Sequence, residues 1–303
     1  MTIVVSNCSK RKRASLDPTL RAGDLAAGSS DFVAAAWSQR LRTAHLVSQV
    51  EDLYGGRAFS EARQTAHGLN ARFAVVSAGL GLVDGNVAVP AYSLTIAHRD
   101  PDGILTKTGS NSSDWWAAVR GCSPFHNASM PDEGLILAAL SSTYLAMVAD
   151  EWAAWPDERL ARLRLFTKEE PKGLAEGLRQ AWMPYDDRLD AAGGGHAGTQ
   201  SDFAQRALRH FAITIGDKGT LDHDRAAVQD GLHGLQARQV PVRARHSDDE
   251  LRTLITNEWD VVSGRSGAML RHLRDDLGVA CEQSRFKRLF GLVINDRTEG
   301  VGP

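Results

Sequence analysis

The segment from Ile3 to Arg13 constrains the fold of this chain more than any other. An apolar, largely β-branched run from Ile3 to Val5 predicts a buried strand, which gives way to the small polar residues Ser6 to Ser9. Four consecutive cations follow, from Lys10 to Arg13. In an open α/β sheet, ligands bind just beyond the carboxyl ends of the strands. Cations at such a position call for an anionic ligand, most simply a phosphate, so we expect an α/β protein that binds anions at its sheet edge.

Length and charge limit the classes of protein to which the chain can belong. With 303 residues, of which 43% are hydrophobic, it can bury a sizeable core, and this length suggests about two domains. Lys and Arg number 35 against 37 Asp and Glu, so nucleic acid is expected to be held by local patches rather than by net charge. No apolar run reaches the roughly 20 residues of a membrane helix, and Met1 leads directly into the predicted strand. We therefore expect a cytoplasmic protein without a membrane partner.

The cysteines give no sign of disulfide or metal chemistry. Cys8, Cys122 and Cys281 are odd in number and lack paired spacing, which indicates neither a disulfide framework nor a zinc ribbon. The cations beside Cys8 would favour a nucleophilic thiolate, and the alternative is a small residue that ends a strand. We predict reduced thiols and no bound metal.

Further strands are predicted to end in small or hydroxylated residues. The apolar runs at 72–77, 134–140 and 162–166 predict strands, and helical spacing predicts helices at 31–51, 60–71, 144–155, 174–182 and 203–211. After Ser77 the chain continues to Asp84 through Gly79 and Gly81, which permit a tight turn and the close approach of a phosphate or sugar. The second of these strands ends at Ser141. Because parallel strands end at one edge, we expect both turns beside the N-terminal loop.

The residue pattern changes near Asp222, where helical segments separated by short turns begin. We predict an α/β domain at 1–220 and a helical region at 221–303, in which Ser247 starts a helix. Two short helices at 270–277 and 282–290, joined around Gly278, fit a helix-turn-helix. Its basic side chains are expected to contact nucleic-acid phosphates, and the alternative is a solvated helical face. They are Arg271, Arg274, Arg285, Lys287 and Arg288.

Three segments, in order, resemble a bacterial family of uncharacterised domains. They are Ser6 to Lys12, Asp52 to Arg63 and Val76 to Val83, which match a Cys-Ser-Lys-Arg-Lys strand end, a leucine-tyrosine helix start and a serine-alanine-x-x-glycine-leucine turn. That family is similar to the central domain of archaeosine synthase and, in fold, to uracil-DNA glycosylases. The resemblance implies a three-layer sandwich, with a mainly parallel sheet between helices, a site at the carboxyl edge and no cofactor. The archaeosine enzyme has Lys-Pro-Tyr after its Cys-Ser, whereas Lys10-Arg11-Lys12 here implies a modified-nucleobase site with added positive charge.

With the helical region added, the chain resembles the phage-defence DNA glycosylases, which attack glycosylated cytosines in viral DNA and leave abasic sites. This implies a DNA glycosylase that excises a modified cytosine, such as glucosylated hydroxymethylcytosine, from phage DNA. DNA is then the partner, and no obligate protein partner is expected. Two alternatives stay open. One is a transferase or hydrolase acting on a modified tRNA base or a free nucleoside, and the other is a DNA-binding regulator without enzymatic activity.

Cleavage of an N-glycosidic bond builds positive charge on the sugar and negative charge on the departing base. We expect Asn7 to hydrogen-bond the flipped base or to orient a water molecule, because an amide is both donor and acceptor. Lys10 is expected to donate to the leaving base or, with Lys12, to hold phosphate. The carboxylate near the sugar is assigned first to Asp84, because it follows the glycine turn, and then to Asp187 and Asp186. The alternative for each is a turn or capping residue.

The remaining candidates are assigned by residue type and position. His196, in a glycine-rich loop, is a candidate acid or electrophile, and the alternative is an exposed histidine. Aromatic residues that could stack on an extruded base are Tyr54, Tyr92 and Trp115, of which Trp115 has the alternative of covering the core. The substrate-binding set is Ser6, Ser9, Lys12, Tyr54, Ser77, Gly79, Gly81, Tyr92, Ser141 and His196. Arg11 and Arg13 join Trp115 and the basic helical residues as nucleic-acid contacts.

Overall fold

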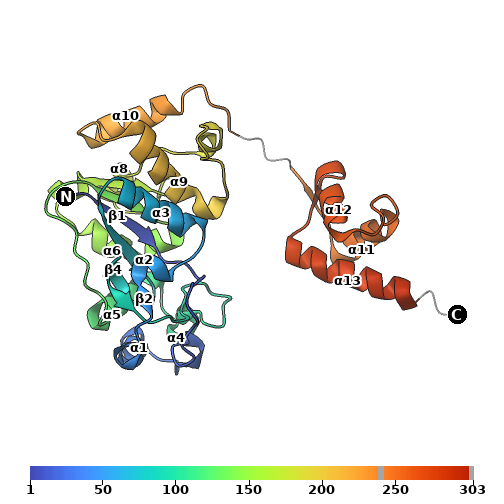
Figure 1. The fold of residues 1–303 in the computed structure, drawn as a ribbon, viewed down its shortest axis with the longest axis horizontal. Helices are drawn as coiled ribbons and strands as arrows, with labels where there is room; N and C mark the ends of the chain where they lie inside the picture. The colour runs from blue at the N-terminus through green and yellow to red at the C-terminus, as the bar shows by residue number, and fades with distance from the viewer. Residues whose placement is uncertain (238–241, 300–303) are drawn as a thin grey trace. The chain divides into compact units, whose positions relative to one another are not determined.

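The computed structural model describes residues 1–237 and 242–299, with the side chains of 298 and 299 left out (Figure 1). The chain forms two compact units, Met1–Arg238 and Gln239–Pro303. The boundary therefore falls after Arg238 rather than after residue 220. The reason is that α10 (Leu221–Gly231) packs into the first unit, where it buries Val228 and Asp224.

Within residues 1–237, the main sheet has five strands in the order β4-β3-β1-β6-β7. The central strand is β1 (Ile3–Asn7), which runs parallel to β3 (Arg72–Ser77) on one side and to β6 (Ile136–Ala139) on the other. Next to β6 lies the parallel strand β7 (Leu163–Phe166). These four strands confirm the predictions. The fifth, β4 (Gly81–Asp84), was predicted as a turn and instead pairs antiparallel with β3.

Helices cover both faces of this sheet. Ile3 through Ser6 are consecutively buried in β1, which requires cover on both sides because successive side chains point to opposite faces. The helices α3 (Arg57–Gly68) and α9 (Phe203–His210) pack on each other and against the strands. A second helical layer consists of α1 (Ser30–Thr43), α5 (Ser112–Cys122) and α6 (Ser142–Ala153), in which α5 packs on both others (Figure 1). A mixed α/β fold with a mostly parallel sheet follows.

Shorter elements complete the first unit. The predicted helix at 31–51 ends at Thr43, because β2 (Ser48–Gln49) pairs antiparallel with β5 (Ala88–Val89). The Thr199 capping box starts the segment that leads into α9, as the sequence predicted. The other helices are α2 (Val50–Leu53), α4 (Ile104–Thr108), α7 (Asp157–Leu160) and α8 (Glu176–Gln180). Short 3₁₀ and π segments are η1 (Ala22–Asp24), η2 (Asp187–Ala191), η3 (Gln200–Asp202) and η4 (Phe211–Ile215).

The second unit is helical, as predicted. Its helices are α11 (Asp248–Asn257), α12 (Ser266–Arg271) and α13 (Gln283–Glu299), and α12 runs on into the π segment η5 (His272–Asp276). Ser247 starts α11 with a capping box, and Leu251, Met269 and Phe286 are buried in a shared core. The connection before α13 contains β9 (Val279–Ala280), which pairs with β8 (Ala244–Arg245). It is therefore longer than the roughly three- to four-residue turn of a helix-turn-helix.

Across the described ranges, none of the helices combines the length and the apolar character that crossing a bilayer requires.

A buried ion pair attaches α10 to the sheet. The Nε of Arg164 in β7 lies 2.5 Å from Oδ2 of Asp224, and their side chains are 1% and 0% exposed. Oδ1 of Asp224 also accepts the backbone N–H of Lys218 at 2.6 Å. Loss of one partner leaves a buried guanidinium without its counter-charge. We expect Asp224→Ala to lower the free energy of unfolding by about 3–5 kcal/mol in urea denaturation.

The matched control is Asp222→Ala, because Asp222 is exposed on the same helix. This variant should stay within about 0.5 kcal/mol of the wild type. Equal losses in the two variants would contradict the importance of the buried pair.

Candidate functional site

The strand order reverses between β1 and β6, which is where an open α/β sheet is expected to bind a ligand. From β1 the chain crosses to β3 on one side, and it then returns to form β6 on the other side. In open α/β sheets such a reversal of strand order opens a crevice beyond the carboxyl ends of the two strands, and ligands bind there. Asn7 ends β1 and Cys8 follows it, while Ser141 and Tyr144 follow β6. We call this place the β1/β6 crevice.

Asn7 joins the two strand ends. Its Oδ1 accepts the backbone N–H of Ser141 at 3.0 Å, and its Nδ2 donates to the carbonyl of Cys8 at 3.0 Å. Each amide atom keeps the capacity for one more hydrogen bond. The predicted contact of Asn7 with a base stays a prediction, and its first role in the structure is to hold the two loops together.

Cys8 and Tyr144 meet at this crevice. The Cys8 Sγ lies 3.1 Å from the Tyr144 hydroxyl, and Cys8 is buried. Burial, followed by the neighbouring Cys8, raises the pKa of Tyr144 well above its usual value, so its hydroxyl stays neutral and keeps its proton. Tyr144 is not among the site residues predicted from the sequence. The signal was available, because Tyr144 lies within one helical turn of the predicted strand end at Ser141.

The side chain of Lys12 points inward, whereas the other three cations of its loop are exposed. Its Nζ donates to the carbonyl of Ser9 at 2.9 Å and lies 4.5 Å from the ring centroid of Tyr92 and 5.0 Å from that of Tyr54. Burial is the largest influence and lowers the pKa of the Lys12 amine. Cys8 acts in the opposite direction, and Lys10 adds to the lowering.

Tyr54 and Tyr92 form the floor beneath this amine. Their hydroxyls are 2.7 Å apart, and the Tyr92 hydroxyl is also 2.6 Å from Ser77 Oγ. Both rings are fully buried, so the prediction that they stack on an extruded base is wrong. Burial raises the pKa of both phenols, which therefore remain neutral. Ser77 is likewise fully buried, and its Oγ accepts the backbone N–H of Leu80 at 3.1 Å, so it belongs to the floor rather than to a substrate surface.

Gly79 and Gly81 serve internal packing. A Cβ at Gly79 would lie 2.5 Å from the Tyr92 ring, and one at Gly81 would lie 2.9 Å from His126. Gly81 also has a positive φ of 85°, which favours glycine. The expected close approach of a phosphate or sugar at these glycines is therefore wrong.

Asp84 lies at the edge of the sheet opposite to the carboxyl edge. Because β4 runs back along β3, Asp84 pairs with Ala74 near the start of β3, and its Oδ1 lies 2.8 Å from Nη2 of Arg72. The prediction that it stands beside the N-terminal loop is wrong. The turn that follows Ser77 does lie at the carboxyl edge, but the unrecognised strand carries Asp84 away from it.

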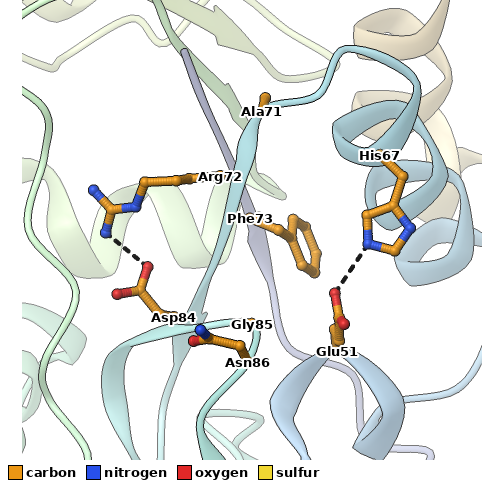
Figure 2. A pocket seen from close by; sticks show the side chains of 8 residues that line it. All are labelled: Glu51, His67, Ala71, Arg72, Phe73, Asp84, Gly85 and Asn86. Carbon is orange, nitrogen blue, oxygen red and sulfur yellow. Dashed lines mark hydrogen bonds and ion pairs between the residues drawn. The ribbon is translucent and has the colours of Figure 1, made fainter. Parts of the chain in front are cut away.

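A hollow of about 380 Å³ surrounds Asp84 at this opposite edge (Figure 2). Figure 2 shows the Arg72–Asp84 pair on one side and the pair of His67 and Glu51 on the other, with His67 Nε2 3.0 Å from Glu51 Oε2. Each of these four charged or titratable side chains has its partner within the hollow. The hollow therefore holds two side-chain pairs at the edge away from the N-terminal loop.

The other two carboxylate candidates belong to a local turn. Asp186 caps η2 by accepting the backbone N–H of Arg188 at 2.9 Å, and its side chain pairs with the Arg188 guanidinium. The capping alternative is therefore confirmed for Asp186. Asp187 is exposed and accepts a hydrogen bond of 3.4 Å from Gln200. Neither residue directly follows β1 or β6, and the assignment of Asp187 as the carboxylate near the sugar stays a prediction.

His196 is buried, against the alternative of an exposed residue, and only 4% of its surface is accessible. Its ring stands edge-on to that of His210, with centroids 5.0 Å apart, and its Nδ1 has no hydrogen-bond partner among the described residues. His210 Nδ1 lies 2.9 Å from the Tyr185 hydroxyl. Burial, and then the cationic Arg209, Arg206 and Arg57, lowers the pKa of His196. The pair belongs to the packing beneath α9.

Two further candidates are internal. Trp115 is fully buried, and its Nε1 donates to the carbonyl of Ala78 at 2.8 Å. The prediction that it stacks on nucleic acid is wrong, and the alternative that it covers the core is confirmed. Ser6 is fully buried, and its Oγ accepts a 3.2 Å hydrogen bond from Gln205 of α9, so its assignment to substrate binding is wrong as well.

The exposed cations of the N-terminal loop lie close to the crevice. Ser9 Oγ fixes the loop, because its one O–H lies within hydrogen-bond distance of the carbonyls of Arg11 and Gly55, at 2.9 and 2.7 Å. Arg11 is exposed, and so is Arg13, which reaches Ser60 Oγ at 3.4 Å. Lys10 is paired with Asp100, although 72% of its side chain is exposed. The loop therefore presents positive charge at the carboxyl edge.

Some of the basic residues predicted to contact nucleic acid in the second unit instead make contacts within that unit. Arg274 donates to the carbonyl of Cys281 at 2.7 Å, and Arg285 and Arg288 both pair with Asp248. Arg271 and Lys287 are exposed. Three of the five expected phosphate contacts thus hold the unit's own backbone and helices in place.

Among the described residues, no group of three His, Cys, Asp or Glu side chains is arranged to hold a metal ion. Comparison of the chain with protein-family models, with curated proteins and with solved structures finds no match.

The buried histidines predict a loss of stability in acid. Burial, and then His196, lowers the pKa of His210 from 6.5 to about 4. The unfolded chain binds a proton at this histidine near pH 6.5, whereas the folded protein resists protonation until about pH 4. The stability that the neutral His210 contributes is therefore complete above pH 6.5 and is lost as the pH falls toward 4. We expect the free energy of unfolding to decrease across this window, and His210→Phe to flatten the decrease in urea titrations at several pH values.

The exposed His98 provides the control, since His98→Phe should keep the wild-type dependence on pH. An unchanged slope in His210→Phe would refute the assignment.

Proposed function

We propose that this protein cleaves the N-glycosidic bond of a modified base in DNA, on a fold like that of uracil-DNA glycosylases. The reaction is assigned to the β1/β6 crevice. Proposed substrates are bulky modified cytosines of phage DNA, as the family resemblance implies.

One observation carries the proposal. The central strand of a mostly parallel sheet ends at its topological switch point in a loop with three exposed cations, Lys10, Arg11 and Arg13, and one inward amine, Lys12. Exposed arginines suit phosphates, because each guanidinium presents several donors in a fixed plane. A nucleotide whose phosphates lie on the exposed cations would bring its sugar and base toward Lys12 and the crevice.

The neutral hydroxyl of Tyr144 suits the departing base. Cleavage leaves negative charge on the base, and a donor aimed at that charge in a low-dielectric site stabilises the transition state. Because burial keeps Tyr144 protonated, its O–H is available as such a donor. The inward amine of Lys12 would add N–H donors toward the same developing charge.

Base release from defined duplexes tests this proposal. Three otherwise identical duplexes would each carry one central cytosine, which is unmodified, hydroxymethylated or glucosylated on the hydroxymethyl group. Mass spectrometry of free bases and strand scission after alkali would follow the reaction. We expect base release from modified duplexes and none from plain DNA.

Two other results of this experiment would indicate a different function. Consumption of a free nucleoside or a tRNA base with modified DNA left intact would point to a transferase or hydrolase. Retention of duplex DNA without base release would indicate a regulator. Either result would overturn the proposal.

The exposed arginines predict a salt dependence of DNA binding. Each phosphate contact contributes about 0.9 to the slope of log K against log salt, so the double variant Arg11→Ala/Arg13→Ala should reduce this slope by about 2. Arg225→Ala serves as control, because Arg225 lies in α10 beside the residues that precede β7, at the opposite edge. A slope that the double variant leaves unchanged would exclude this loop from the DNA interface.

A further inference from the structure

We propose that Lys12 is a nucleophilic amine that forms an imine with the C1′ aldehyde of an abasic site, which gives the protein a strand-cleaving lyase activity beyond base removal. The inference rests on the proposed function for the origin of the abasic site. Its test starts from an abasic site prepared beforehand, and therefore does not require the protein to release a base.

The surroundings of Lys12 differ from those of a lysine that serves only as a charge. Lys10, two residues away, is paired with the carboxylate of Asp100. Among the described residues, Lys12 has no carboxylate partner, and its one hydrogen bond goes to the neutral carbonyl of Ser9. The amine has three N–H donors when charged, so the single carbonyl leaves most of its capacity unused.

The partial burial of Lys12 favours the neutral amine while leaving it within reach. Its nitrogen is packed over two buried tyrosine rings, and these rings exclude water from one side. Desolvation in such a pocket is a recognised way to obtain an unprotonated lysine, which is the nucleophilic form. The residue as a whole is still partly exposed, unlike the tyrosines below it. A substrate arriving from the cationic rim would meet this nitrogen first.

Neither the carboxylates of Asp84 and Asp186 nor the tyrosines of the floor offer a competing nucleophile. Asp84 and Asp186 are held in ion pairs with Arg72 and Arg188, and Asp84 lies at the other edge of the sheet. The hydroxyls of Tyr54 and Tyr92 are fully buried and neutral. Lys12 is thus a partly exposed amine that the loop brings toward the crevice.

The chemistry balances without an oxidant or a reductant. The amine nitrogen attacks C1′ of the ring-opened sugar, and the carbonyl electron pair moves to oxygen, which takes up the proton that nitrogen releases. The resulting carbinolamine loses water and forms the imine. Transfer of a 2′ proton to solvent water then expels the 3′ phosphate, because the imine accepts the electrons of the broken C–H bond. Water finally hydrolyses the imine, and the lysine is regenerated.

Reductive trapping tests the inference directly. The full-length protein would be incubated with a labelled duplex that contains one aldehydic abasic site, in the presence of sodium cyanoborohydride, which supplies the hydride that fixes an imine. We expect a covalent protein–DNA adduct, whose peptide mass maps to Lys12. A duplex with a tetrahydrofuran abasic analogue, which lacks the aldehyde, should give no adduct.

Substitutions separate nucleophilicity from charge. Lys12→Arg keeps the positive charge but lacks a nucleophilic amine, so it should bind the duplex and lose the adduct. Lys172→Arg is the matched control at an exposed lysine outside the loop, and it should retain the adduct. If Lys12→Arg fails to fold, the site of attachment in the wild-type protein still decides the matter.

An adduct mapped to another residue, or no adduct with the aldehydic duplex, would overturn the inference. Failure of the proposed function looks different, since it would appear as absent base release from modified duplexes while trapping on the prepared abasic site persists.

Discussion

The placement of β1 between β3 and β6 is the constraint on which the rest of the first unit depends. Parallel strands on both edges and helices on both faces enclose β1, and its carboxyl end leads into Asn7 and the basic loop. The same pairing creates the switch in strand order between β1 and β6, which is where open α/β sheets bind ligands. Asn7 then bonds to the Ser141 backbone and fixes the width between the two loops. Sequence position and sheet topology thus bring polar residues to one place.

The basic side chains at this edge form an outer, exposed set and an inner, partly buried one. Arg11 and Arg13 are exposed and suit phosphates, whereas Lys12 lies over aromatic rings in a drier environment. The division follows from the backbone, because Lys12 forms an antiparallel bridge with Tyr54, which directs it toward the floor of buried hydroxyls. A run of four basic residues therefore contains two chemically different kinds of side chain.

Much of the fold could be predicted from apolar periodicity. The strands at β1, β3, β6 and β7, and the helical nature of the second unit, follow from the sequence because buried parallel strands appear as continuous apolar runs. The hairpin strand β4 could not be recognised, because Gly81 made the segment resemble a turn. Because this segment was interpreted as a turn, Asp84 was predicted at the carboxyl edge, whereas it lies at the opposite edge of the sheet. The burial of Tyr54, Tyr92 and Trp115 depends on contacts between distant segments, which local patterns do not report.

We propose that nucleic acid binds at the carboxyl edge through the N-terminal loop. Hydrogen exchange of the full chain, with and without a duplex that carries a glucosylated hydroxymethylcytosine, measures this contact. We expect slower exchange of backbone amides in peptides that cover residues 6–13 and 140–144. Slower exchange confined to residues 242–299, with these two segments unchanged, would contradict it.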